Sequence, residues 1–136
     1  MRGARPIRYP RLVMDAAFMP ELLARLDASE EIEIETALPG GPVHRVIIWV
    51  MVEDGEVLVR SYLGSDARWF REATTTGQAV LLVEGERVPV RVIPATDDGS
   101  IERASRGLVR KYAHSASLPP MLRPEILDTT LRVEPA

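Results

Sequence analysis

The sequence predicts a mainly β (α+β) domain in which six short antiparallel strands curl into a small barrel with helices at its periphery. Three observations support this class. Six segments have strand-like patterns, two pairs of them are joined by tight turns, and some of the strands are apolar on both faces. Curling a sheet until its edges meet covers such strands and leaves no exposed edge. An open α+β sheet is the alternative that the same elements allow.

The N-terminal segment differs in composition from the rest of the chain. Residues 1–14 mix arginine, proline and a few apolar residues, and we expect a flexible arm there. Residues 15–136 are expected to form a single domain, because a chain of this length suits one core. Leu22, Leu23 and Leu26 lie at helical spacing within residues 20–27 and predict a short amphipathic helix.

The first strands are predicted from alternation of apolar and polar residues. Residues 31–37 read EIEIETA, which places two isoleucines on one face and the glutamates on the other. Residues 44–53 read HRVIIWVMVE, which is apolar on both faces and therefore predicts a strand covered on both sides. Asp54-Gly55 then predicts a hairpin that leads into a strand over residues 56–63.

The rest of the chain predicts another hairpin, a short connecting helix and a late helix. Residues 79–84 and 87–94 are expected to pair through a turn at Gly85-Glu86, and Pro89 favours a sheet edge or a bulge. The remaining expected elements are a helix over residues 66–75 ended by Gly77, a helix over residues 101–113, a proline-containing loop over residues 115–124 and a closing strand over residues 129–133.

Composition excludes several function classes. The net charge of −3 and the pI of about 5.4 argue against nucleic acid as a partner. No apolar run approaches the roughly 20 residues of a membrane helix, so no membrane association is expected. The chain has no cysteine and only two histidines, His44 and His114, neither with a partner at motif spacing, so neither a metal site nor a catalytic triad is predicted. We expect a soluble cytoplasmic protein.

A candidate anion site lies at the start of the helix predicted over residues 66–75. Backbone N–H groups of residues 64–67 would be free there, and Arg60, Arg68 and Arg71 are close in sequence. This combination predicts a cradle for phosphate or carboxylate. The alternative is that Asp66 satisfies the N–H groups and the arginines are ordinary surface residues.

Aromatic and basic side chains elsewhere extend this candidate site. Trp49, Trp69 and Tyr62 could stack on a planar ring, although core packing is favoured for Trp49. Lys111 in the late helix could contribute a cation to a pocket. The alternative places Lys111 on a solvated basic face with the arginines of the same helix, which are Arg103, Arg106 and Arg110.

Four segments of the sequence resemble a known bacterial family. They are IIWVMVEDGEVLVRSYLGSDARWFREA (residues 47–73), GERVPVRVIP, RKY (residues 110–112) and TTLRVEP. The pattern is similar to that of domain of unknown function 2255, and the similarity extends over about residues 31–135. That family is in turn similar to the split barrels of the pyridoxamine-phosphate-oxidase type and to deazaflavin-dependent reductases. The resemblance therefore implies a split β-barrel.

The resemblance also implies a function. It implies a homodimer with FMN or a deazaflavin at the subunit interface, acting as an oxidoreductase on an unknown small substrate. The cofactor-binding residues would be Arg60, Ser61, Ser65, Arg68, Trp69, Arg71 and Lys111. Asp66 and Ala67, however, stand where those oxidases have two basic residues. The alternatives are a non-catalytic module that binds a small anionic or aromatic ligand, and a dimeric interaction module that has lost the flavin.

Overall fold

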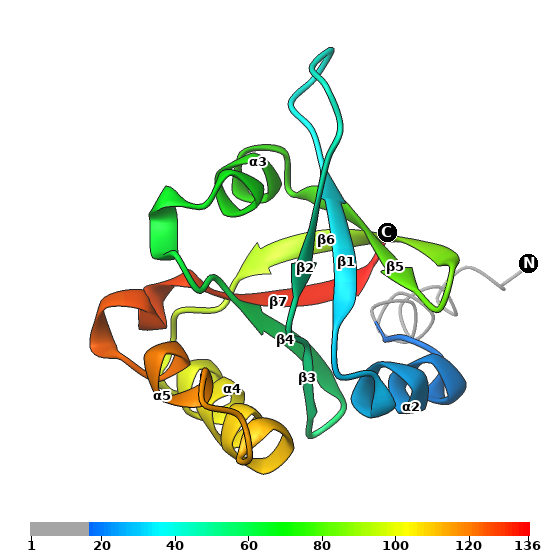
Figure 1. Cartoon of the computed structure of the whole chain (residues 1–136). Coiled ribbons are helices and arrows are strands. Elements are labelled where there is room, and N and C mark those ends of the chain that lie inside the picture. Colours follow the sequence, from blue (N-terminus) through cyan, green and yellow to red (C-terminus); the bar gives the residue numbers. More distant parts are fainter. Residues whose placement is uncertain (1–16) are drawn as a thin grey trace, which may run out of the picture.

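Seven antiparallel strands form one curled sheet in residues 17–136, the part of the chain that the computed structural model describes. The arm predicted over residues 1–14 lies outside this part. The sheet order is β2-β1-β5-β6-β7-β4-β3. The strands are β1 (Ile32–Thr36), β2 (His44–Ile48), β3 (Met51–Glu53), β4 (Glu56–Arg60), β5 (Gln78–Val83), β6 (Glu86–Pro94) and β7 (Thr130–Pro135). The sheet is a half-barrel (Figure 1), which confirms the predicted class with seven strands instead of six.

The seventh strand arises because the strand predicted over residues 44–53 bends in its middle. Its first half, β2, pairs with β1, and its second half, β3, pairs with β4 at the opposite edge of the sheet. At the bend, the Val50 N–H donates to Tyr112 Oη at 3.3 Å, and the Val50 carbonyl accepts from Lys111 Nζ at 2.7 Å. Buried backbone groups that leave a ladder need such partners. One bent segment therefore joins both edges of the sheet.

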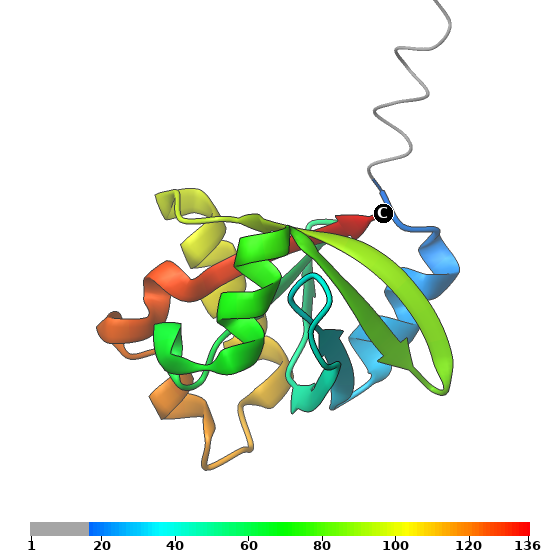
Figure 2. The same ribbon diagram turned by 90° about the horizontal axis from the view of Figure 1, so that it is seen from above.

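The half-barrel encloses the main hydrophobic core. Alternate residues of the strands face inward, among them Ile34, Leu81 and Val133, which are nearly fully buried. Helix α2 (Pro20–Ala28) adds Leu26 to this core, and helix α3 (Arg68–Thr76) adds Trp69 and Ala73. Seen from above in Figure 2, α3 lies beside the hairpin of β1 and β2.

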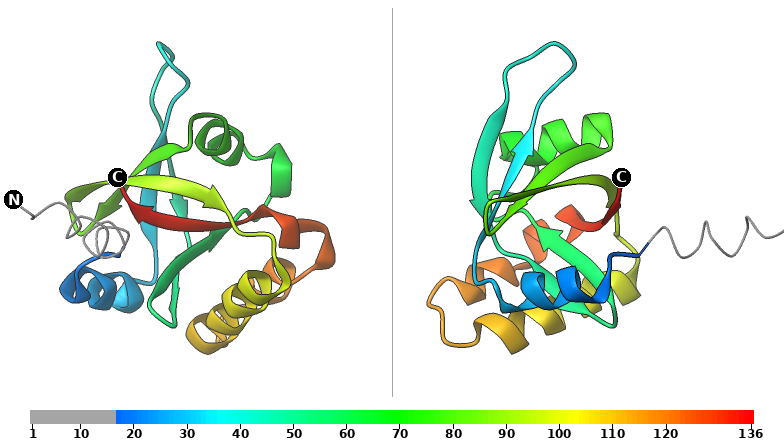
Figure 3. Two further views of the ribbon diagram at one scale, coloured as in Figure 1. Left: turned by 180° about the vertical axis from the view of Figure 1, so that it is seen from behind. Right: turned by 90° about the vertical axis from the view of Figure 1, so that its right-hand side faces the viewer.

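A second core lies between helix α4 (Asp98–Tyr112) and the hairpin of β3 and β4 (Figure 3). Met51 and Leu58 from the strands pack there with Leu108 and Tyr112 from the helix. Helix α4 is also held by ion pairs on its basic face. Those pairs join Arg103 to Asp54 and Glu56, Arg106 to Glu53 and Asp54, and Arg110 to Glu53 and Asp27. The arginines of this face are therefore paired with acids of β3, β4, their turn and α2.

Both predicted hairpins are present, with one shift in register. Asp54 and Gly55 form the first turn with φ of 52° and 79°, as a two-residue link requires. The second turn is Glu84-Gly85, with φ of 51° and 84°, and so lies one residue before the predicted Gly85-Glu86. Pro89 lies at a local sheet edge, as predicted, because β7 ends at Pro135 opposite Val90.

The remaining boundaries follow from local hydrogen bonds. β4 ends at Arg60, earlier than predicted, because the Ser61 hydroxyl donates to the Gly64 carbonyl at 2.7 Å and turns the chain. The segment η2 (Gly64–Asp66) is a 3₁₀ turn, so α3 begins two residues later than predicted. α4 begins at Asp98 because the Asp97 side chain accepts the Ser100 N–H at 3.0 Å.

The predicted helix over residues 20–27 is confirmed by α2, and the closing strand by β7. The predicted loop over residues 115–124 contains a short helix, α5 (Leu118–Met121), and is followed by the 3₁₀ segment η3 (Pro124–Thr129). No helix within residues 17–136 is long and apolar enough to cross a membrane.

The close approach of α4 to β3 generates a prediction for Gly107. A Cβ at this position would lie 3.0 Å from Met51 Cβ and 2.8 Å from Glu53 Cγ. A Gly→Ala substitution inside a helix usually stabilises the folded protein by about 0.5–1 kcal/mol, but overpacking of a core lowers its stability by about 1–3 kcal/mol. We expect Gly107→Ala to lower the melting temperature by several degrees in a thermal unfolding experiment. Gly99→Ala, whose Cβ would meet only Asp97 Oδ2 at 3.4 Å, is the control. A Gly107→Ala protein as stable as Gly99→Ala would contradict this packing.

Candidate functional site

A cavity of about 400 Å³ lies near the ends of β2 and β4 and the start of α3. Its walls are mainly apolar and aromatic, and they carry a few polar groups. The lining residues are Glu30, Glu31, Ile47, Ile48, Trp49, Arg60, Tyr62, Trp69, Ser115, Ser117 and Met121. Concave sites of this size and character are typical places for small ligands.

Arg60 is the most unusual polar residue of this cavity. Its side chain is only 2% exposed, and it donates four hydrogen bonds. The acceptors are Thr130 Oγ1, Ser105 Oγ, the Met121 carbonyl and the Ile101 carbonyl, at 2.9–3.1 Å. All four are neutral, and within residues 17–136 no carboxylate forms an ion pair with Arg60.

Burial lowers the pKa of Arg60 to about 10, so the guanidinium still carries its charge at neutral pH. Arginine has five N–H donors, and the hydrogen bonds of Arg60 leave one N–H of Nη2 without an acceptor among residues 17–136. A buried cation without a counter-ion is costly for the fold. The site therefore retains both a positive charge and a donor for an acceptor group that enters the cavity.

Three aromatic side chains line the same cavity. The ring of Trp49 is stacked on Tyr112, with centroids 3.9 Å apart and planes at 2°. Trp69 is 7% exposed and packs edge-on against Phe70, whereas Tyr62 is half exposed beneath the guanidinium of Arg123. Trp49 thus makes the expected packing contacts and also lines the cavity. Both tryptophans of the chain contribute to one site.

Of the seven residues predicted to bind a cofactor, Arg60 and Trp69 line this cavity. Ser61 follows Arg60 directly, but its hydroxyl donates to Gly64 O. The predicted cradle at residues 64–67 does not present a row of free N–H groups. The N–H groups of Gly64, Asp66 and Ala67 donate to carbonyls of residues 61–64 at 3.1–3.4 Å.

The other predicted residues near this turn are exposed. Ser65 and Arg68 lie at the surface and are not among the lining residues of the cavity. Arg71 folds back on the turn, where Nη1 donates to the carbonyls of Ser65 and Asp66. Ser65, Arg68 and Arg71 thus do not line the cavity to which Arg60 and Trp69 contribute.

Lys111 is held at the bend between β2 and β3 and does not line the cavity. Its Nζ donates to the carbonyls of Leu26 at 3.0 Å and Val50 at 2.7 Å. Burial lowers the pKa of Lys111 to about 8, and burial also raises the pKa of Tyr112 to about 12. Lys111 does not lie on the basic face formed by the arginines of α4, and it fixes the bend instead.

One polar cluster was not predicted from the sequence. His44 Nδ1 lies 3.1 Å from the Glu72 carboxylate, and the Thr36 hydroxyl donates to the same carboxylate at 2.8 Å. Burial opposes ionisation of Glu72, but the bonds from Thr36 and His44 outweigh it and lower its pKa. These residues come from β1, β2 and α3, so no sequence spacing signals them. Within residues 17–136, no three His, Asp or Glu residues are placed to hold a metal ion.

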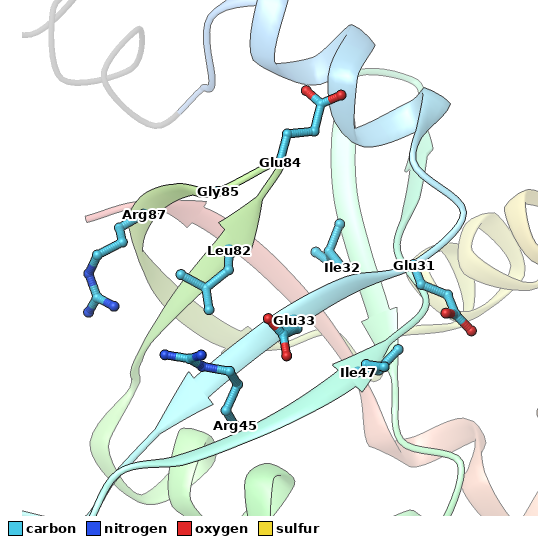
Figure 4. Close-up of a pocket in the computed structure, with 9 residues that line it drawn as sticks. All are labelled: Glu31, Ile32, Glu33, Arg45, Ile47, Leu82, Glu84, Gly85 and Arg87. Carbon is cyan, nitrogen blue, oxygen red and sulfur yellow. The ribbon is translucent and has the colours of Figure 1, made fainter.

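A groove on the outer face of the sheet lies next to the cavity (Figure 4). Glu33 and Arg45 project into it from β1 and β2, and Leu82 adds an apolar surface from β5. Glu31 and Ile47 line both the groove and the cavity. The outer face of β1, β2 and β5 is therefore continuous with the mouth of the cavity.

The curled sheet of this chain is similar in fold to the split barrels of several solved structures. A putative pyridoxamine 5′-phosphate oxidase from Listeria innocua is 14% identical, with a TM-score of 0.59 over 85% of this chain and 90% of that one. HutZ, the heme storage protein from Vibrio cholerae, is 11% identical, with a TM-score of 0.58 over 88% and 91%. A conserved hypothetical protein from Mycobacterium tuberculosis is 13% identical, with a TM-score of 0.60 over 90% and 82%.

Residues 22–133 match the model of a bacterial family described as uncharacterized protein conserved in bacteria, DUF2255. The chain belongs to this family, so the resemblance found in the sequence is confirmed. No curated protein matches the sequence significantly.

The environment of Lys111 generates a prediction about pH. Its pKa is about 8 in the folded protein and near its ordinary 10.5 in the unfolded chain, so between these values the unfolded chain binds more protons. Stability therefore rises with pH in this range. Tyr112, with its raised pKa, acts in the opposite direction above its ordinary 10.0. We expect the unfolding free energy of the wild type, relative to Lys111→Met, to increase from about pH 7 to about pH 9.5 in urea titrations. Parallel curves for the two proteins would contradict the buried, charged state of Lys111.

Proposed function

We propose that this protein binds a planar aromatic small molecule in the cavity, with an acceptor oxygen of the ligand directed at Arg60. The observation that carries this proposal is a charged guanidinium, 2% exposed and without a carboxylate partner in residues 17–136, in a cavity lined by two tryptophans. A free N–H on a buried cation gains most from a ligand oxygen, because charge-assisted hydrogen bonds are about twice as strong as neutral ones.

The aromatic walls support a flat ligand. Tyr112 covers one face of the Trp49 ring, so a ligand ring in the cavity would stack on the opposite face. Trp69 and the half-exposed Tyr62 supply further aromatic surface. Ile47, Ile48 and Met121 complete an apolar lining, and such a lining with a few polar groups orients a ligand.

A flavin- or deazaflavin-dependent oxidoreductase acting on a small substrate is the second candidate function. The split-barrel fold favours it, because a structural neighbour is named as a putative oxidase of pyridoxamine 5′-phosphate. A flavin ring fits the aromatic walls. Its phosphate does not fit this chain alone, because Arg60 is the one cationic side chain among the lining residues and most of its donors are used. The cofactor would supply hydride chemistry, and this chain would bind and orient its ring.

We also propose that the protein forms a homodimer through the outer face of β1, β2 and β5. This face carries the apolar residues Ile47 and Leu82 beside charged groups of both signs, and Glu35 there pairs with Arg45 and Arg87. Exposed apolar surface rimmed by polar groups is typical of protein interfaces. A second copy seated there would border the mouth of the cavity. The location of the protein in the cytoplasm stays a prediction.

The dimer proposal predicts an effect of one substitution. Leu82→Arg places a charge at the centre of the outer face, so we expect the molecular mass in light scattering to fall from dimer to monomer. Val109→Arg is the matched control, because Val109 is also an exposed apolar residue, 48% exposed, but lies on α4. A monomeric wild type, or a dimer that survives Leu82→Arg, would contradict the proposal.

The ligand proposal predicts that Arg60, and not Arg68, contributes to ligand binding. We expect riboflavin and 2-naphthoate to quench the tryptophan fluorescence, since both tryptophans line the cavity. Arg60→Met should weaken binding about ten- to hundredfold, as loss of a hydrogen bond to a charged group costs about 1.5–3 kcal/mol. The matched control Arg68→Met should not, because Arg68 does not line the cavity.

Arg60→Met also removes four internal hydrogen bonds, so its melting temperature should fall, and its binding is measured by calorimetry well below that temperature. Tyr62→Ala, at a half-exposed position, should weaken binding with little effect on folding. Weaker binding in Arg68→Met with unchanged binding in Arg60→Met and Tyr62→Ala would instead support the cradle at residues 64–67.

A further inference from the structure

The charges around the cavity are unfavourable for a highly charged ligand. Its lining holds two carboxylates, Glu30 and Glu31, against the single guanidinium of Arg60. Arg60 is buried, whereas both glutamates are exposed, so the glutamates lie on the solvent side of the site. The two negative charges of the site are therefore more exposed to solvent than its one positive charge.

The fold fixes where these two carboxylates are attached. The Glu30 carbonyl accepts the Tyr112 hydroxyl at 2.6 Å, and Glu31 directly precedes β1. His114 Nε2 lies 3.9 Å from the Glu30 carboxylate, but both side chains are about 70% exposed, so this contact neutralises little of the charge. Within residues 17–136, Glu31 has no ion-pair partner.

The cations that would hold a phosphate are directed elsewhere. Arg71 is bonded to carbonyls of the η2 turn, and Lys111 to carbonyls of Leu26 and Val50. Arg68 is exposed outside the cavity, and Asp66 adds a further carboxylate at the predicted cradle. A phosphate dianion is usually held by several charged donors at once, and Arg60 is the one cationic side chain among the lining residues of this cavity.

We propose that Glu30 and Glu31 make the cavity selective for unphosphorylated aromatic ligands that carry at most one negative charge. Arg60 is the one cationic partner for the acceptor oxygen of such a ligand. The inference rests on the proposed ligand site and specifies its ligand class. Selection against a competing ligand through like charges is a common source of specificity. The two glutamates are specificity-determining residues, and they act by repelling the phosphate of otherwise identical ligands.

Riboflavin and FMN provide the test, because they differ only in the terminal phosphate. We expect FMN to bind the wild-type protein about tenfold more weakly than riboflavin, which corresponds to about 1.4 kcal/mol. In the double variant E30Q/E31Q the ratio of the two dissociation constants should approach one, mainly through tighter FMN binding. The control E33Q removes a carboxylate of β1 that lies two residues after Glu31 and does not line the cavity, and its ratio should match the wild type. Added salt should narrow the wild-type difference, since it screens exposed charges.

The outcomes separate this inference from the function on which it rests. If riboflavin binds and FMN binds equally or more tightly, or if E30Q/E31Q leaves the ratio unchanged, the selectivity is overturned while the ligand site stands. If neither compound quenches the tryptophans, the ligand site itself is contradicted and the selectivity falls with it. If the ratio of the FMN and riboflavin dissociation constants falls to about one in E30Q/E31Q and stays at the wild-type value in E33Q, both the ligand site and its selectivity are supported.

Discussion

The bend at Trp49 and Val50 is the constraint on which the rest of this structure depends. β2 and β3 are two halves of one apolar segment, and they pair at opposite edges of the sheet. A strand can leave its ladder inside a protein only where other groups satisfy its backbone. Here α4 supplies those groups from its last turn, as Tyr112 and Lys111 take the two polar atoms of Val50. The curl of the sheet therefore depends on how α4 is seated.

The same bend creates the cavity. Because the chain turns at Trp49, the indole leaves the strand surface, stacks on Tyr112 and lines the space beside Arg60. The ion pairs between α4 and the β3–β4 hairpin, together with the close packing at Gly107, fix α4 against the bend. The candidate site and a structural junction thus share residues. This arrangement lowers the stability of the fold, because it buries the charged groups of Lys111 and Arg60, whose pKa values are lowered by that burial.

Local sequence patterns were sufficient for most of the fold. The alternation in β1, the Asp54-Gly55 turn and the glycine that ends α3 are signals carried by neighbouring residues, and each element is present. The bend was not predictable, because residues 44–53 have the pattern of one continuous strand and the partners of Val50 lie about 60 residues away. The contact of His44 with Glu72 was missed for the same reason, since it joins elements 28 residues apart.

The candidate site shows where sequence proximity fails as a guide to function. Arg60, Arg68 and Arg71 are close in sequence, yet β4 ends directly after Arg60 and buries it, whereas the η2 turn takes up its own N–H groups and Arg71. The other residues that line the cavity of Arg60 come instead mainly from β2, α3 and the segments before β1 and after α4. A split barrel can in this way keep a ring-sized cavity while the polar groups around it change, which separates the fold from the ligand that it binds. In the selectivity that we propose, the charges of Glu30 and Glu31, and not the barrel, determine which ligands bind.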